Sequence, residues 1–230
     1  MMISPETYYE EYLQGKGKSA ILQQISLLKK EIDRLKEVME SDENSPKAMI
    51  MPSPLTRIKC NREYLEMAKL ALEEAGGQYE LTDEEMRGLS FNARLADMHR
   101  FILEIGGFFN GYTKYKYTIS GDRVLFDADH SFYLKPSNLP VYEPFSREEF
   151  VRGIAALHIG EWKERYENLY VLDGTQWSIC VEYEDGMLPF EIYGSNAYPY
   201  NFEELIDFLG IDNSDTDEMG DDYDEEADEE

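Results

Sequence analysis

Basic residues are scarce in this sequence and are nowhere concentrated. The 230 residues include 48 Asp and Glu against 22 Lys and Arg, which gives a formal net charge of −26. Twelve acidic residues lie in segment 212–230, so the other 211 residues still carry 36 acidic against 22 basic side chains. Because neutralising phosphates requires clustered Lys and Arg, we expect neither direct nucleic-acid binding nor attachment to an anionic membrane surface.

The sequence also has only two cysteines and no long apolar run. Cys60 and Cys180 lie far apart in different kinds of segment, which does not indicate a disulfide framework and favours a reducing compartment. No stretch approaches the ~18 consecutive apolar residues of a membrane span, and the N-terminus lacks the apolar region of a signal peptide. We therefore expect a cytoplasmic protein that does not bind membranes.

Motifs of nucleophilic, nucleotide-dependent and metal-dependent enzymes are missing as well. There is no G-x-S-x-G, G-x-G-x-x-G or Walker pattern, and the three histidines show no metal-ligand spacing. Asp127, Asp129 and His130 are the best candidates for a metal or catalytic cluster, although acidic residues at a strand end also discourage edge pairing. An EF-hand match in the acidic tail fails at its fifth position, Met219. The sequence predicts no cofactor and no metal.

Hydrophobic periodicity predicts two long helices in the first third of the chain. Apolar residues from Ile21 to Met39 recur at alternating spacings of four and three, which is the seam of an amphipathic helix. We expect Asn61 to cap a second helix with a similar seam, which ends at Gly76. The simplest arrangement is an antiparallel hairpin within one chain, and the alternative is a homodimer that shares the first seam.

Capping boxes and a change of period organise the rest of the chain. Thr82–Glu85 and Ser146–Glu149 each match the pattern that starts a helix, and Asn201 with Glu204 resembles a third cap. From about residue 100 the apolar period is 2, which predicts strands. The predicted strands cover 101–105, 115–119, 123–126, 177–183 and 190–192, with 132–134 as a further short candidate.

These elements predict the α+β class, in which an antiparallel β-sheet is covered by helices. We expect an N-terminal helical hairpin or arm over residues 1–80 and the sheet domain over residues 81–211. The acidic segment 212–230 cannot bury apolar surface and is expected to be a disordered tail.

Several segments carry a resemblance to known sequences. Residues 101–211 contain IGGFFNGYTKYKYTIS, LHIGEW, LDGTQWSICVEYEDG and IYGSNAYPYNFEEL, and the N-terminus contains YYEEYLQGK. On these segments the chain resembles an uncharacterised α+β protein family of gut-type anaerobic bacteria. The resemblance covers most of the chain except the acidic tail, and it implies no activity, cofactor or functional residue.

Three aromatic and polar segments are candidates for a binding surface, because Tyr and Trp offer large contact areas at low entropic cost. The same residues have an alternative role in filling the core, or in forming the hinge between a strand and a helix. The candidates are Phe108, Phe109, Tyr112 and Tyr115 in the first segment, Asp173, Gln176 and Trp177 in the second, and Ser195, Asn196, Tyr198 and Tyr200 in the third.

The acidic composition and the absence of a catalytic motif favour an interaction protein over an enzyme. We expect a basic or nucleic-acid-binding protein partner, bound by an inhibitor or immunity-type protein of a phage or defence system. A sharper version is that the acidic surface mimics nucleic acid. The alternatives are an enzyme with a site around Asp127–His130 and an oligomeric scaffold assembled through the Ile21–Met39 seam.

Overall fold

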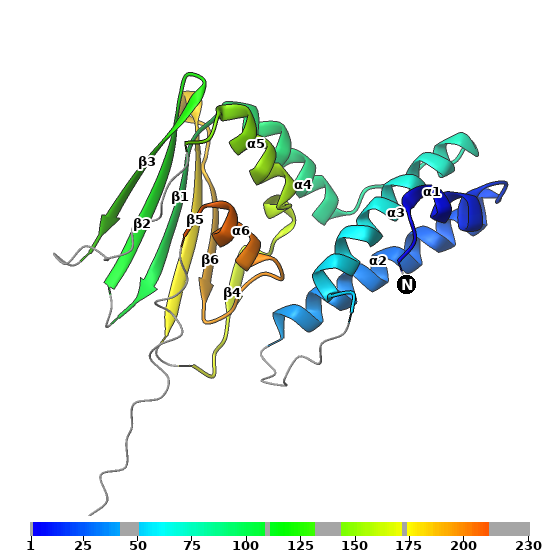
Figure 1. The fold of residues 1–230 in the computed structure, drawn as a ribbon, viewed down its shortest axis with the longest axis horizontal. Coiled ribbons are helices and arrows are strands. Elements are labelled where there is room, and N and C mark those ends of the chain that lie inside the picture. Colours follow the sequence, from blue (N-terminus) through cyan, green and yellow to red (C-terminus); the bar gives the residue numbers. More distant parts are fainter. Residues whose placement is uncertain (1, 42–50, 109–110, 132–143, 172–173, 212–230) are drawn as a thin grey trace, which may run out of the picture.

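The fold of the chain is α+β, as the sequence predicts. A helical hairpin packs against the helical layer of a six-stranded sheet (Figure 1). None of the described helices combines the length and the apolar character that crossing a bilayer requires. The acidic tail and the short strand expected at 132–134 lie outside the described residues. The structure is a computed structural model that describes residues 2–41, 51–108, 111–131, 144–171 and 174–211.

Helices α2 (Lys18–Glu40) and α3 (Pro54–Glu74) form the hairpin, after the short α1 (Pro5–Tyr8) and the π-helical turn η1 (Tyr9–Leu13). The seam of α2 packs against α3 of the same chain, which confirms the expected intramolecular hairpin. A homodimer through these helices stays a prediction, and it would have to use another face of them. The buried seam residues of α2 are Ile21, Ile25, Leu28, Ile32 and Leu35.

The start of α3 differs from the prediction. Ser53 is the N-cap, because its Oγ accepts a hydrogen bond from the Thr56 amide at 3.2 Å, and Pro54 occupies the first helical position. Asn61 is buried about two turns into this helix. The prediction that Asn61 caps α3 is therefore wrong, and the Ser–Pro pair that the sequence contains at 53–54 was the correct start signal.

Six strands form one sheet in the order β3-β2-β1-β5-β6-β4. Neighbouring strands are antiparallel, except that β4 runs parallel to β6. The predicted strands of the described chain are present, and the three-residue β4 is an addition that periodicity did not indicate. The strands are β1 (Met98–Gly107), β2 (Gly111–Ser120), β3 (Arg123–His130), β4 (Arg165–Glu167), β5 (Thr175–Tyr183) and β6 (Phe190–Ser195).

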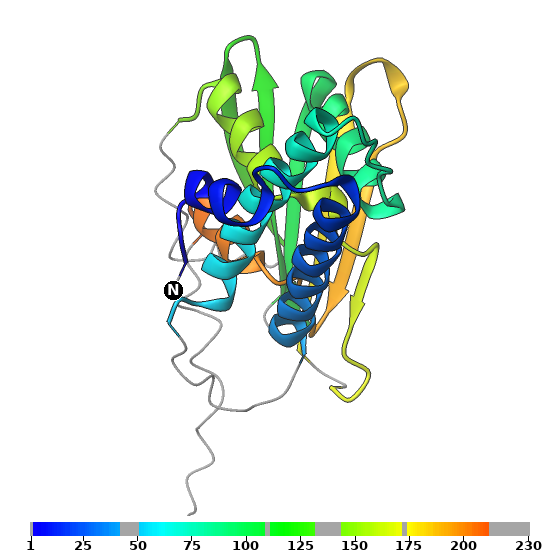
Figure 2. The same ribbon diagram turned by 90° about the vertical axis from the view of Figure 1, so that its right-hand side faces the viewer.

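Helices α4 (Asp83–Arg94), α5 (Arg147–Ala156) and α6 (Phe202–Phe208) cover one face of the sheet, and the hairpin lies outside them (Figures 1 and 2). Both predicted capping boxes are confirmed, at the N-termini of α4 and α5. The 3₁₀ turns are η2 (Leu95–Asp97), η3 (Ile159–Glu161) and η4 (Glu184–Gly186).

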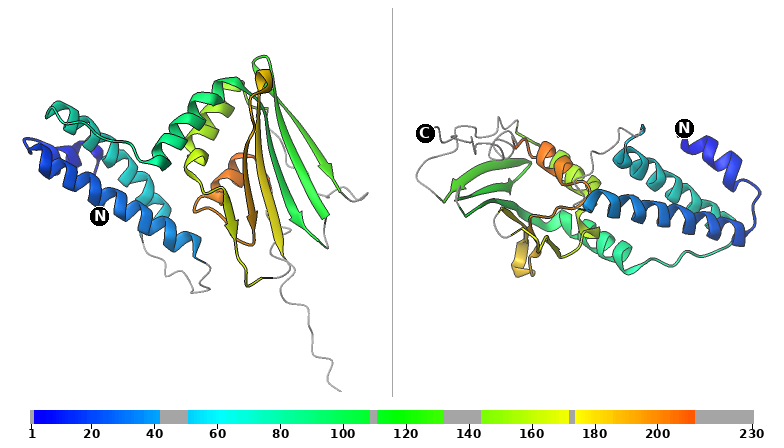
Figure 3. Two further views of the ribbon diagram at one scale, coloured as in Figure 1. Left: turned by 180° about the vertical axis from the view of Figure 1, so that it is seen from behind. Right: turned by 90° about the horizontal axis from the view of Figure 1, so that it is seen from below.

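The two faces of the sheet differ in what covers them. Because side chains alternate along each strand, Phe101, Tyr117 and Ile179 point toward the helices and are fully buried. The Phe150 ring of α5 lies 6.1 Å from the Phe101 ring and 5.5 Å from the Tyr117 ring. On the opposite face, which we call the open face, no described helix lies (Figures 1 and 3). The core is therefore one-sided.

Ion pairs attach the hairpin to the sheet domain. Arg62 of α3 donates to both carboxylate oxygens of Glu161 in η3, at 3.1 and 2.6 Å, and Lys36 of α2 lies 2.7 Å from Glu84 and 3.6 Å from Glu161. His158 ends α5 in the left-handed region (φ 53°), and its Nδ1 lies 3.2 Å from Glu161. Burial opposes ionisation of Glu161, but hydrogen bonds from His158 and Arg62 outweigh it and hold the pKa well below its ordinary value.

Asn201 does not cap α6 through its side chain, so that prediction is also wrong. Its Oδ1 accepts a hydrogen bond from Trp162 Nε1 at 3.0 Å, and its Nδ2 donates to the Leu157 carbonyl at 2.8 Å. Because the amide is buried, these tertiary hydrogen bonds satisfy both of its ends and outcompete the local cap. Glu204, the expected capping partner, instead forms an ion pair with Lys59 of the hairpin.

Candidate functional site

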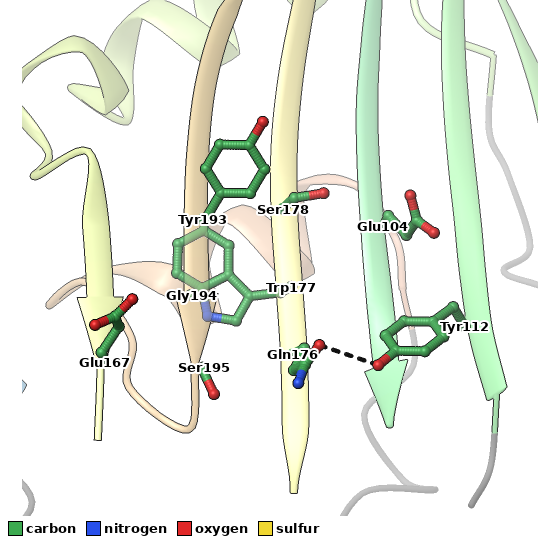
Figure 4. A pocket seen from close by; sticks show the side chains of 9 residues that line it. All are labelled: Glu104, Tyr112, Glu167, Gln176, Trp177, Ser178, Tyr193, Gly194 and Ser195. Carbon is green, nitrogen blue, oxygen red and sulfur yellow. Dashed lines mark hydrogen bonds between the residues drawn. The ribbon is translucent and has the colours of Figure 1, made fainter. Parts of the chain in front are cut away.

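A pocket of about 390 Å³ lies on the open face, near the end of the sheet where β1 stops and β5 begins (Figure 4). We call it the sheet pocket. Five of the six strands contribute to it, so it depends on the assembled sheet and not on one segment. Its lining residues are Glu104, Tyr112, Glu167, Gln176, Trp177, Ser178, Tyr193, Gly194 and Ser195.

Most of the lining residues form two rows, in each of which neighbouring strands contribute residues that lie in register. The first row crosses three strands. Glu104 of β1 is in register with Ser178 of β5, which is in register with Tyr193 of β6. Glu104 forms an ion pair of 3.0 Å with Lys114 of the neighbouring β2. A hydrogen bond to Glu191 raises the pKa of the Tyr193 phenol. The row therefore has a carboxylate at one end, a small hydroxyl in the middle and an aromatic ring at the other end (Figure 4).

The second row crosses all the strands from β2 to β4. Tyr112 Oη donates a hydrogen bond of 3.0 Å to Gln176 Oε1 across Gly106, whose lack of a side chain leaves the path open. Ser195 lies opposite Gln176, and Glu167 lies opposite Ser195. The small residues Ser178 and Ser195 leave the surface low between the strands, and larger side chains stand around them (Figure 4).

Trp177 supports the sheet pocket from the covered side. Its indole is almost fully buried, donates from Nε1 to the Ala197 carbonyl at 3.0 Å, and lies 4.7 Å from the ring of Phe202. The ring lies against Gly194, where a Cβ atom would overlap it. Only glycine fits this position, so Gly194 and Trp177 together fix the spacing of β5 and β6 beneath the pocket.

An ordered turn beside the sheet pocket presents apolar side chains to solvent. The Asn168 amide donates to the Ser195 carbonyl at 2.9 Å, and Asn168 Oδ1 accepts from the Tyr170 amide at 3.0 Å. Leu169 is 81% exposed and Tyr170 is 98% exposed. Large apolar side chains held in this way are typical of interaction surfaces. We call Leu169 and Tyr170 the apolar turn.

The structure brings together candidates from all three predicted segments. Tyr112, Gln176, Trp177 and Ser195 line the sheet pocket. Asn196 follows Ser195 in the chain and its backbone adopts the left-handed region (φ 52°). The backbone N–H of Asn196 donates a hydrogen bond to the Thr175 carbonyl at 2.9 Å. The stretch after β6 is thus both a hinge and one edge of the pocket.

Three other candidates lie elsewhere. Tyr115 is buried on the covered face of the sheet. Tyr198 stacks on Trp177 at 6.3 Å, and burial raises the pKa of its phenol. Tyr200 is buried at the junction with the hairpin, where its Oη accepts a hydrogen bond from Arg62 Nη2 at 3.3 Å.

The first segment also includes Phe108, which is largely exposed at the turn after β1 and does not line the sheet pocket. Phe109 and Asp173 lie outside the described residues. Their roles as binding residues stay predictions.

Sequence reasoning missed five lining residues. Ser178 and Tyr193 lie on strands whose alternation was predicted, so the period-2 pattern already assigned a face to each of them. Glu104 lies in an apolar run, Glu167 lies in the short β4, and Gly194 lies near the end of β6. No local signal places these last three beside one another, because their proximity depends on the order of the strands.

The alternative catalytic residues do not converge. Asp127 and Asp129 of β3 both pair with Lys116 of β2 on the open face. His130 points to the covered face, where its Nδ1 lies 2.8 Å from Thr113 Oγ1. In the described ranges, no group of three or more His, Cys, Asp or Glu residues is arranged to hold a metal ion.

The sheet pocket has an acidic and aromatic lining. Glu104 and Glu167 supply carboxylates, and none of the described lining residues is Lys, Arg or His. The neighbouring cations, Lys114 and Arg165, pair with these carboxylates at 3.0 and 3.5 Å from positions outside the lining. The pocket therefore offers hydrogen-bond acceptors and tyrosine rings to an incoming donor group.

Comparisons with models of known protein families, with curated proteins and with solved structures found no match.

Proposed function

We propose that this chain is a non-enzymatic binding protein whose sheet pocket takes a basic side chain of a protein partner. One observation carries the proposal: the pocket combines the carboxylates Glu104 and Glu167 with the rings of Tyr112 and Tyr193, and no cation is among its described lining residues. Gln176 adds an amide to the same lining.

The chemistry of an arginine side chain fits this lining. A guanidinium group carries five donors, pairs with carboxylates through two parallel hydrogen bonds and stacks on aromatic rings. The apolar turn, Leu169 and Tyr170, supplies contact area next to the pocket. The formal charge of −26 would attract a basic partner from a distance and speed its association.

An inhibitor or immunity-type role is the version of this proposal in which binding blocks the activity of the basic partner. A cytoplasmic location fits it, because Cys60 and Cys180 are both free thiols. Mimicry of nucleic acid by the open face has less support, since Lys114 and Lys116 stand between the carboxylates there and interrupt any continuous row of negative charge.

A peptide titration tests the proposal. The probe is a short peptide with one arginine between glycines, blocked at both ends, and the control peptide has neutral citrulline in place of arginine. Two-dimensional NMR of the full chain should show shifts at the amides of Gln176, Ser178 and Ser195 with the arginine peptide. The citrulline peptide should leave these amides unshifted, and added salt should weaken the arginine effect.

Either of two results would contradict the proposal. Shifts spread evenly over the acidic surface would mean that the sheet pocket does not select the cation. Equal shifts with the citrulline peptide would mean that the pocket recognises a neutral polar group instead.

A further inference from the structure

A second hollow, of about 710 Å³, lies between the hairpin and α4. Its walls are α3 and α4, and residues of α2, η3 and the segment that joins α3 to α4 complete it. We call it the helical groove. The hairpin and α4 lie on the covered side of the sheet (Figure 3), so the groove between them is separate from the sheet pocket.

Exposed leucines stand on both walls of the helical groove. Leu70 of α3 is 56% exposed and Leu89 of α4 is 55% exposed, while Leu81, in the segment between these helices, is also exposed. Leucines exposed on the walls of one groove form an apolar surface that a partner can cover.

Every Lys and Arg that lines the helical groove is already neutralised by the chain itself. Lys29 and Lys69 each lie 3.1 Å from Glu85, while Lys36 and Arg62 pair with acidic residues at the junction. These ion pairs weaken the attraction of the groove for an acidic partner.

Three lining carboxylates form no ion pair with any described residue: Asp33, Glu63 and Glu73. All three residues are exposed to solvent. Partial burial of its carboxyl group and the neighbouring Glu84 raise the pKa of Asp33, and they outweigh the opposing effect of Lys36 and Lys29. The groove thus combines exposed leucines with uncompensated negative charge.

We propose that the helical groove docks a basic amphipathic helix of a protein partner, with its apolar side chains on Leu70, Leu81 and Leu89 and its Lys or Arg side chains on the unpaired carboxylates. Helix-in-groove binding uses apolar residues at i, i+3, i+4 and i+7. The α3 wall runs from Arg62 to Glu73, which corresponds to ~17 Å of helix axis, so a helix of about three turns matches it. This site goes beyond the proposed function, because it is on another surface and recognises a helix.

A designed peptide provides the probe. It has about 14 residues, with leucines at helical spacing on one face and lysines elsewhere, and the control peptide has the same composition in an order that spreads the leucines around the helix. Circular dichroism should show that the amphipathic peptide gains helicity on adding the full chain, and the control peptide should bind at least about fivefold more weakly.

Matched variants locate the binding. Leu70→Asp and Leu89→Asp should each weaken peptide binding by about tenfold, since each removes a leucine-sized apolar contact and places a carboxylate that loses its hydration against the leucine face. Leu27→Asp is the control, because Leu27 is similarly exposed (52%) on α2 but does not line the groove. Glu63→Gln with Glu73→Gln should reduce the salt dependence of binding, whereas Glu10→Gln with Glu11→Gln should not.

Three outcomes would overturn the inference. The first is equal weakening by Leu27→Asp and Leu89→Asp, which would show that the effect of Leu89→Asp does not come from the groove. The second is binding without a gain of peptide helicity. The third is self-association of the free chain in analytical ultracentrifugation that Leu70→Asp abolishes, which would assign the groove to a second copy. Each of these leaves the arginine-peptide titration of the sheet pocket unaffected, so the two proposals fail separately.

Discussion

The two faces of the sheet use aromatic residues in opposite ways. On the covered face, Phe101, Tyr117 and Phe150 are fully buried with ring centroids 5.5–6.5 Å apart, so their area stabilises the fold. On the open face, Tyr112 and Tyr193 stand among polar side chains at the edge of the sheet pocket. Residues of the same kind therefore serve stability on one face, and on the other they are free to contact a partner.

Ion pairs follow the same division. On the covered side, the Arg62 and Glu161 side chains are only 18% and 14% exposed, and they join the hairpin to the sheet domain. On the open face, the carboxylates of Asp127 and Asp129 are mostly exposed where they pair with Lys116. Exposed pairs contribute little to stability, whereas breaking a buried pair is costly.

The largest contrast is expected from apolar truncations. Phe150→Ala should lower the free energy of unfolding by about 3–5 kcal/mol, because it leaves a cavity between α5 and the sheet. Leu125→Ala on the open face, where Leu125 is exposed, should change it by less than about 0.5 kcal/mol. Urea unfolding of both variants measures the two changes in unfolding free energy. Similar losses of unfolding free energy would contradict the conclusion that only the covered face stabilises the fold.

Replacing carboxylates on the two sides of the sheet should give a smaller difference in stability. Glu161→Gln should cost about 3 kcal/mol, because the largely buried Arg62 loses its charged partner at the junction, whereas Lys36 keeps its ion pair with Glu84. Asp129→Asn removes an exposed carboxylate that also pairs with a lysine, and it should leave the unfolding midpoint unchanged. Equal shifts of the thermal midpoint in the two variants would argue that the junction pair is no more structural than the surface pair.

The dependence of stability on pH gives a third test on the covered side. Burial alone would raise the pKa of Glu85, but hydrogen bonds from Thr82, Tyr79, Lys29 and Lys69 outweigh it and lower the pKa to about 2. A carboxyl group with a lowered pKa stabilises the fold above its ordinary pKa of 4.5, and it loses that contribution as the pH falls toward 2.

The corresponding measurement is urea unfolding of the unmodified chain and Glu85→Gln between pH 7 and pH 3. The difference between their unfolding free energies should be constant above about pH 5.5 and shrink below about pH 4.5. A difference that stays constant down to pH 3 would show that Glu85 is not held ionised by its neighbours.

Local patterns in the sequence predicted most of the fold. Alternation located the strands, the seam of α2 identified the hairpin, and Thr82 and Ser146 began helices where their capping boxes indicated. The predictions for Asn61 and Asn201 were wrong because both side chains are buried, and long-range packing decides the role of a buried amide.

The sheet pocket was only partly predictable. Tyr112, Gln176 and Ser195 were predicted as polar and aromatic residues of separate segments. Their proximity follows from the β2-β1-β5-β6 order, which brings Tyr112 and Gln176 together across 64 positions of the chain. The sequence around Glu104 and Glu167 contains no local sign of a binding role. Only the pairing of distant strands brings these two carboxylates into one site. The resemblance to an uncharacterised family stays a prediction.

The most direct test of the sheet pocket compares two carboxylates of the open face. Glu104 and Glu182 are 36% and 39% exposed, and each lies 3.0 Å from a cation on a neighbouring strand, but only Glu104 lines the pocket. We expect Glu104→Gln to raise the dissociation constant of the arginine peptide about fivefold and Glu182→Gln to change it less than about twofold. Equal effects of the two substitutions on the dissociation constant would contradict a binding site for a basic side chain in the sheet pocket.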